Sequence, residues 1–218
     1  MLRRGAHETQ PIHTVDSMTG SHAAPRHSSD DTSGDDTSHA HPSHRSLGVS
    51  VSPDDFKSLF RGHPGGVAVI TAHGEHGPVA LTASSVSSVS VDPPLLIFSA
   101  SAISSATPVI ASAQTLVVHL LDADDIEVAR RGATSGIDRF ADVDSWTRLA
   151  TGEPVFHGVR AWARCAVVSR MDAGNSTVIA AHALQVNIER DVAPGDAGNA
   201  LVYHNRAWHR LGDHSLLD

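Results

Sequence analysis

The stretch LTASSVSSVSVDPP, residues 81–94, carries six hydroxyl side chains between Thr82 and Ser90 and then ends in two prolines. Small side chains let a backbone approach a ligand closely, and hydroxyls offer both donors and acceptors. Pro93 and Pro94 have no N–H, so the chain must turn stiffly after Asp92. The run predicts a strand that passes along a flat, polar ligand. An edge strand rich in serine, with no ligand, fits the same residues equally well.

A second hydroxyl-rich segment, SASAISSATP, occupies residues 99–108, directly after an apolar strand. We expect a short helix that begins with Thr107 as its cap and Pro108 at the first position. Hydroxyls and unpaired amides at such a helix start can hold a phosphate without lysine or arginine. Together the two segments predict a site for a hydrogen-bonding ring with a phosphate tail, and an ordinary helix cap is the alternative. The hydroxyls concerned are those of Ser104, Ser105 and Thr107.

Composition narrows the class of protein. The chain has 218 residues, of which 40% are hydrophobic and 18% charged, which fits one soluble domain plus some additional chain. The net charge of −8 argues against nucleic acid or an anionic membrane surface as the main partner. Cys165 is the only cysteine, which excludes an internal disulfide and a CxxC metal or redox pair, and favours the cytoplasm.

The chain divides near residue 50. Residues 1–50 contain no aromatic side chain and no apolar periodicity, which predicts a disordered tail. Seven of the 16 histidines lie in it, so it is either a weak metal-binding segment or a dispensable extension. Residues 51–218 are predicted to form the folded domain.

Strand patterns dominate the second part of the chain. In residues 176–189 five of the seven even positions are apolar and four of the seven odd positions are polar, which predicts a half-buried antiparallel strand with the even side inward. We therefore expect a mainly β fold with short helices, closed as an antiparallel barrel. The predicted strands are 66–72, 78–84, 95–100, 115–121, 160–171, 176–189 and a closing pair within 200–211. The predicted helices follow the cap residues Ser52, Thr107 and Asp122.

Other candidate sites are weaker. His73 and His76 form an HxxH in a predicted hairpin turn without further ligands, so we expect no metal there. Arg160, Arg164 and Arg170 share one strand face, which fits a solvated exterior or the rim of a dimer, with anion binding as the alternative. No P-loop, GxGxxG, GxSxG or HExxH pattern is present.

The segment LTASSVSSVSVDPPLLIFSASAISSATP, preceded by FRGHPGGVAVITA and followed by GIDRFA, resembles the flavin reductase-like family. These are short-chain NAD(P)H:flavin oxidoreductases with an FMN-binding antiparallel split β-barrel, and the similarity covers residues 53–211. The resemblance implies a homodimer with flavin at the dimer interface. It also implies hydride transfer from NADH or NADPH to FMN or FAD, and supply of reduced flavin to a separate monooxygenase.

Site residues follow from the same resemblance, position by position. The flavin ring and ribityl chain would be lined by Thr82, Ala83, Ser84 and Ser85, followed by Ser88, Val89 and Ser90. Ser105 and Thr107 match the phosphate-binding hydroxyls, Ser104 assists them, and Phe140 matches an aromatic near the cofactor.

The chain departs from the family where the nicotinamide is expected. The family has Gly-Asp-His before its long strand, and this chain has Gly174, Asn175 and Ser176. His182 is a second candidate imidazole, or else a packed core or interface histidine. Because hydride passes directly from nicotinamide to flavin, no protein acid or nucleophile is required, and we predict no catalytic side chain.

Two alternative functions are compatible with the same predicted fold. One is an FMN-binding protein without efficient NAD(P)H oxidation, which would explain the missing Asp-His pair. The other binds a different planar cofactor, a haem or a deazaflavin. His119, which replaces a family asparagine, is the residue that raises the haem hypothesis.

Overall fold

The computed structural model describes residues 50–217. The predicted tail therefore lies outside the described residues, apart from Ser50. Helix α1 (Pro53–Arg61) belongs to a unit that ends at Phe60, and residues 61–217 form a second unit. No helix among the described residues is long and apolar enough to span a membrane.

Helix α1 begins as the sequence predicts. The Ser52 hydroxyl accepts a hydrogen bond from Asp55 N at 3.1 Å and donates one to the Asp55 carboxylate at 2.7 Å, which stabilises the first turn. Phe56 and Phe60 lie on one side with ring centroids 4.8 Å apart. Both rings, with Leu59, are more than half exposed.

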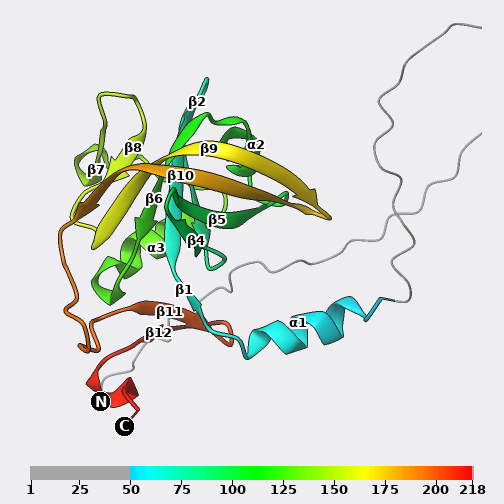
Figure 1. Ribbon diagram of the computed structural model, residues 1–218. Coiled ribbons are helices and arrows are strands. Elements are labelled where there is room, and N and C mark those ends of the chain that lie inside the picture. The colour runs from blue at the N-terminus through cyan, green and yellow to red at the C-terminus, as the bar shows by residue number, and fades with distance from the viewer. Residues whose placement is uncertain (1–49, 218) are drawn as a thin grey trace, which may run out of the picture. The chain divides into compact units, whose positions relative to one another are not determined.

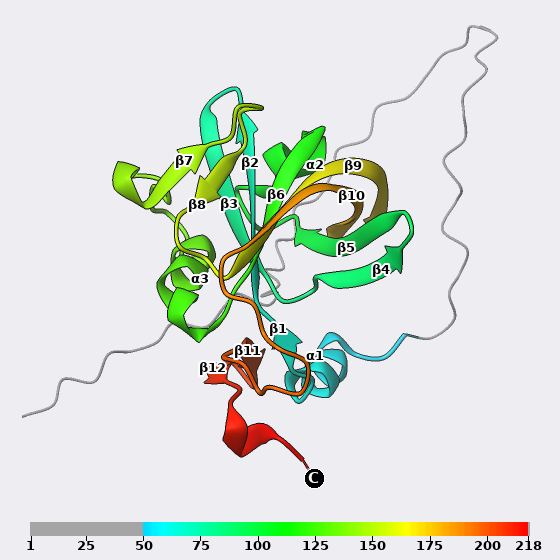
Figure 2. The same ribbon diagram turned by 60° about the vertical axis from the view of Figure 1, so that its left-hand side comes forward.

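The second unit is built on a seven-stranded antiparallel sheet with the order β3-β2-β6-β9-β10-β5-β4 (Figures 1 and 2). The outermost strands, β3 and β4, are consecutive in the chain and are joined by residues 84–86. The architecture is mainly β with short helices, as predicted. The bounds are β2 (Ala68–Gly74), β3 (Gly77–Ala83), β4 (Ser87–Val91), β5 (Pro94–Ser101), β6 (Thr115–Leu120), β9 (Ala161–Ala173) and β10 (Ser176–Ile188).

Smaller elements complete this unit. The predicted closing pair, β11 (Leu201–His204) and β12 (Ala207–Arg210), forms a three-stranded sheet with β1 (Gly65–Gly66). A hairpin of β7 (Trp146–Arg148) and β8 (Pro154–Phe156) was not predicted, because three-residue strands are too short to show a periodicity. The helices are α2 (Thr107–Ser112) and α3 (Ile126–Ala133).

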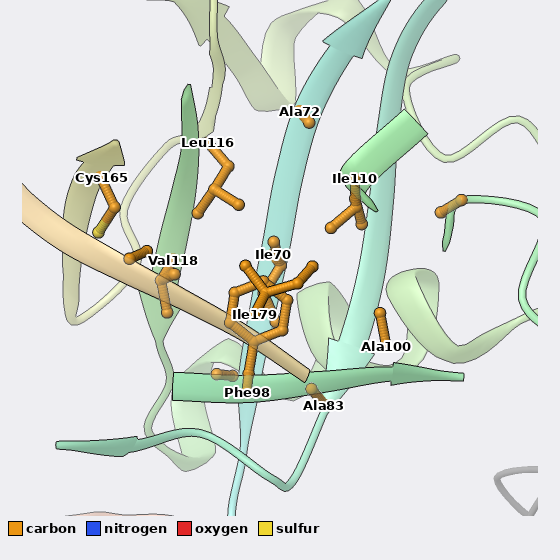
Figure 3. Packing of buried hydrophobic residues seen from close by; sticks show 13 residues of the cluster. Ile70, Ala72, Ala83, Phe98, Ala100, Ile110, Leu116, Val118, Cys165 and Ile179 are labelled. Atoms are coloured by element: carbon orange, nitrogen blue, oxygen red, sulfur yellow. The ribbon is translucent and has the colours of Figure 1, made fainter. Parts of the chain in front are cut away.

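One core lies inside the curved sheet. Figure 3 shows Phe98 of β5 and Ile179 of β10 meeting Ile70 of β2, with Ile110 of α2 directed into the same cluster. Cys165 of β9 is also part of this cluster and is fully buried. Small residues at other positions of the cluster, such as alanine, let the strands curve closely around it.

A second core covers the other face of β2 and β6. Phe140 and Phe156 stack there at 5.2 Å with an interplanar angle of 10°, and Val69 packs in the same cluster. Helix α3 also contributes through Ala129. β2 and β6 are therefore buried on both faces, which explains their nearly continuous apolar sequences.

Two sequence predictions of detail were wrong. In β10 the odd residues Ile179 and Ala181 fill the barrel, whereas Leu184 and Val186 of the predicted inner side are exposed. The apolar alternation predicted the wrong inward face, because this strand carries apolar side chains on its outer face as well. In α2 the cap residue is Ala106, and Thr107 is the first helical residue.

Candidate functional site

The serine run forms a bend and an edge hairpin instead of one strand. β3 ends at Ala83, and β4 then pairs with β5 through Ser87 opposite Ile97 and Val91 opposite Pro94. The Asp92–Pro93 peptide bond is cis, at the turn that joins β4 to β5. Four of the predicted flavin-contacting residues, Ser84, Ser85, Ser88 and Val89, are exposed here, and Ser90 is half-buried.

Ser85 holds the bend against β5. Its hydroxyl accepts a hydrogen bond from Ser99 N at 3.0 Å and lies 3.3 Å from Ser99 O. The side chain thereby takes the place of a strand partner where β3 has ended. Ser84 and Ser88 have no such internal hydrogen bond from their hydroxyls among the described residues, so these groups are available to a ligand.

The first two residues of the predicted ring-binding set face the protein. The Thr82 hydroxyl donates to Ala129 O of α3 at 2.7 Å, and the Ala83 methyl group lies in the inner core. Their contribution to a ligand would therefore come from the backbone. Gly132 of α3 makes this contact possible, because a Cβ there would lie 2.3 Å from Thr82 Oγ1.

The predicted phosphate-binding segment folds back on itself before α2. Thr107 is 6% exposed, and its hydroxyl donates to Ser101 O at 2.6 Å. The Ser104 hydroxyl accepts from Ala106 N at 3.3 Å. Ser105 is exposed. Of the three predicted hydroxyls, that of Ser105 is the one free of an internal hydrogen bond among the described residues.

Arg170 of β9 holds the other end of α2. Its guanidinium donates to Ala111 O and, at 2.6 Å, to Ala113 O. A cation at this end also complements the helix dipole. Arg164 instead pairs with the buried carboxylate of Glu153 at 2.7 Å. The expectation of a solvated arginine face was therefore wrong for Arg164, whose side chain is 17% exposed and pairs with Glu153, whereas Arg170 is exposed as expected and also holds α2.

Phe140 lies within the second core. It is 5% exposed and stacks on Phe156, and its carbonyl accepts from Trp146 Nε1 at 3.1 Å. Its ring packs in the hydrophobic interior, so it supports the neighbouring elements of the fold.

The nicotinamide-side candidates do not lie together. Gly174, Asn175 and Ser176 form the turn between β9 and β10, where Gly174 has a φ of 64° and Asn175 O accepts from Ala102 N at 2.9 Å. This turn thus adjoins the Ser101–Thr107 segment. His182 lies six residues further along β10, opposite Leu95 of β5.

Sequence reasoning missed a cavity of about 700 Å³ that is bordered by Val86 of the bend. Its walls are mostly apolar, with contributions from β1, β6 and β11, and Asp122 and Arg190 lie at its polar side. The cavity gives a ligand room next to the serine run. Its residues come from seven separate stretches of the chain, so no local sequence motif indicates the cavity.

An ion-pair network supports the polar side of this cavity. Arg190 contacts the carboxylates of Asp122 at 2.9 Å and Asp125 at 2.6 Å, and it donates to Gly158 O at 2.5 Å. Burial opposes ionisation of Asp122, but hydrogen bonds from Arg190 and from Asp124 N outweigh it and lower its pKa. Asp122 also caps the 3₁₀ turn before α3, as its position in the sequence predicts.

His119 is a structural residue of the core. Its Nε2 accepts from Phe156 N at 3.2 Å, so Nδ1 carries the proton and donates to Val69 O at 2.9 Å. Burial lowers its pKa to about 4. Both ring nitrogens are engaged inside the protein, which leaves no ligand for a haem iron.

Comparison with known proteins agrees with this architecture. Residues 60–212 match the family model described as flavin reductase like domain. An NADH:FMN oxidoreductase from Rhodococcus erythropolis is 37% identical over 164 residues, covering 75% of this chain and 84% of that protein. An NADH-dependent FMN reductase from Agrobacterium fabrum is 34% identical over 130 residues, covering 60% and 74%.

Solved structures agree as well. A flavin reductase domain protein from Arthrobacter superposes with a TM-score of 0.67 at 31% identity, covering 76% of this chain and 97% of that one. The flavin reductase component of a bacterial two-component tryptophan halogenase gives 0.64 at 29% identity, covering 74% and 99%. These likenesses confirm the predicted split-barrel fold. The chain therefore belongs to the flavin reductase-like family.

Proposed function

We propose that the NAD(P)H-dependent flavin reduction of this family proceeds here with NADH as the hydride donor and FMN as the acceptor. The observation that carries the proposal is the 37% identity to an NADH:FMN oxidoreductase over three quarters of the chain. FAD and NADPH are the alternative substrates. A cytoplasmic location stays a prediction from the single cysteine.

The flavin site we propose lies at the bend before β4 and along β4, which is an edge strand of the sheet. Exposed hydroxyls at Ser84 and Ser88, with the backbone of Thr82 and Ala83, suit a hydrogen-bonding ring. At the other end of β5, the exposed Ser105 hydroxyl suits the phosphate, while the neighbouring amides of Ser104, Ala106 and Thr107 are bonded within the segment. Val89, Ser90, Ser104 and Thr107 complete the proposed set. Ser85 supports the bend, and Phe140 packs in the second core.

These residues would bind and orient a flavin, and the bound flavin would supply the redox chemistry. Hydride moves directly between two stacked rings, so the chain has to hold them in register and keep water away. The cavity beside Val86 supports this proposal, because it offers space next to the ring-binding bend. No proton donor or nucleophile from the chain is required for that step.

We further propose that two copies of the chain form the working unit. β9 and β10 carry large apolar side chains that are more than 45% exposed in the single chain, and burying such side chains against a second copy would be favourable. The residues concerned are Val168, Met171, Leu184, Val186 and Ile188. A flavin-dependent monooxygenase is the transient partner that would consume the reduced flavin.

The alternative function is flavin binding without efficient NAD(P)H oxidation. The observation in its favour is the turn of Gly174, Asn175 and Ser176, which lacks the acid and the imidazole that the family resemblance implies.

The test is to follow NADH absorbance with the purified protein, with FMN present and absent, and to repeat it with NADPH and FAD. Flavin-dependent oxidation of NADH supports the proposal. Tight, stoichiometric flavin with no oxidation of either nicotinamide would establish the binding-only alternative.

A further inference from the structure

His182 lies on the outer face of the sheet, in the same row as Ser90 of the serine run. It is opposite Leu95 of β5, and Leu95 is opposite Ser90 of β4. Directly opposed residues of antiparallel strands point to the same face. The neighbouring row, with Ala181 opposite Leu96, points into the inner core. The side chains of His182 and Ser90 therefore share the face that is turned away from the core.

The His182 imidazole has no internal partner. No hydrogen bond, ion pair or ring contact involves it among residues 50–217, although the side chain is half-buried. The residue opposite it on β9 is Ala166, and the nearest residue of β10 on the same face is Ala180. These methyl groups leave space around the ring. A half-buried polar group without a partner is costly unless a ligand or water satisfies it.

The spacing suits a ligand that bridges His182 and Ser90. Two strand spacings separate them, roughly 10 Å, a distance that a three-ring system spans. The Gly174–Ser176 turn lies six residues along β10, roughly 20 Å away, beside the segment of Ser104 and Thr107. Within one chain, His182 is therefore better placed than the Gly174–Ser176 turn to contact the flavin ring. The turn is better placed to lie near the phosphate.

We propose that His182 hydrogen-bonds the ring system of the bound flavin from the β10 side, opposite the serine run. This inference rests on the proposed flavin site. An imidazole N–H directed at a ring carbonyl or nitrogen would orient the flavin and stabilise the negative charge that it gains on reduction.

The experiment measures the dissociation constants of FMN and riboflavin by fluorescence quenching, and the KM for NADH in steady-state assays. The variants are His182→Phe, which keeps a ring without nitrogen, His182→Gln, which keeps a hydrogen-bonding group, and His182→Ala. His76→Ala, in the exposed hairpin turn between β2 and β3, is the matched control. Urea midpoints check that each variant folds.

We expect His182→Phe and His182→Ala to raise the dissociation constants of FMN and riboflavin alike, by roughly fivefold, while His182→Gln retains most of the affinity. His76→Ala should match the unmodified protein. Unchanged flavin affinity in folded His182→Phe would overturn the inference, and so would a change confined to the KM for NADH. If the unmodified protein binds flavin but oxidises no NADH, the proposed function is wrong. The His182 contact is still tested in that case, because its test is the change in the flavin dissociation constants.

Discussion

The Thr82 hydroxyl donates a 2.7 Å hydrogen bond to Ala129 O and so joins the strand that leads into the serine run to helix α3. Thr82 is thus the point at which the strand before the bend of the serine run is attached to the second core. The contact links a residue of the predicted ring-binding set to a helix outside the proposed site.

We expect Thr82→Val to lower the free energy of unfolding by about 1 kcal/mol, because it removes this hydrogen bond while keeping the side-chain volume. Thr82→Ser keeps the hydroxyl and should recover most of that loss. Urea denaturation of the three proteins measures the difference. Equal midpoints for Thr82→Val and the unmodified protein would show that the hydrogen bond contributes nothing to stability.

Gly132→Ala should destabilise the protein by about 1 to 3 kcal/mol, since the added Cβ would lie 2.3 Å from Thr82 Oγ1 and 3.3 Å from Val69 Cγ2. Part of the clash involves the Thr82 hydroxyl. The double variant Gly132→Ala with Thr82→Ala should therefore be more stable than the sum of the two single effects predicts. Strict additivity in a double-mutant cycle is the result that would contradict this contact.

Arg170→Ala should weaken FMN binding several-fold and leave riboflavin binding unchanged. The reason is that Arg170 holds Ala111 O and Ala113 O, and through α2 it fixes the segment proposed to bind the phosphate, which riboflavin lacks. Comparison of the two dissociation constants tests this. Arg210→Ala is a matched control, because that exposed arginine pairs weakly with Asp124 at 3.7 Å. An equal loss of affinity for both flavins would point to a general distortion instead.

His119 should make stability depend on pH between 6.5 and 4. Its pKa is about 4 in the folded protein and about 6.5 when unfolded, so the unfolded state binds the extra proton throughout this interval. The contribution is complete above pH 6.5 and is lost as the pH falls toward 4, a change of about 3 kcal/mol. Urea midpoints of the unmodified protein and His119→Asn at pH 7, 5.5 and 4 measure it. The two proteins should differ in slope, and parallel pH profiles would refute the assignment.

The positions of the large strands along the chain could be predicted from local sequence, because each has a strong apolar pattern bounded by turn residues. The cap at Asp122 was likewise a local signal. Which face of β10 points inward was not predictable, since both faces carry apolar residues and a bulge follows Ala183. Burial of the odd face depends on β5 and β9 curving around Ile179, which is a property of the whole sheet.

The candidate site was predicted unevenly for a related reason. Hydroxyl-rich segments suggested where a ligand lies, but local sequence does not tell which hydroxyls the protein uses internally. Thr82 and Thr107 are satisfied within the fold, whereas Ser84 and Ser105 remain open. The Arg190 network and the cavity join segments distant in sequence, so no motif could reveal them.

The burial of Cys165 has a consequence for an enzyme that handles reduced flavin. Reduced flavin reacts with dioxygen to give peroxide, which oxidises thiolates far faster than thiols because the thiolate is the attacking nucleophile. Burial raises the pKa of the Cys165 thiol to about 12, and the side chain is fully enclosed. The only sulfhydryl group of the chain is therefore protected from the oxidant that its own activity can release, and we expect turnover in air to leave it unmodified.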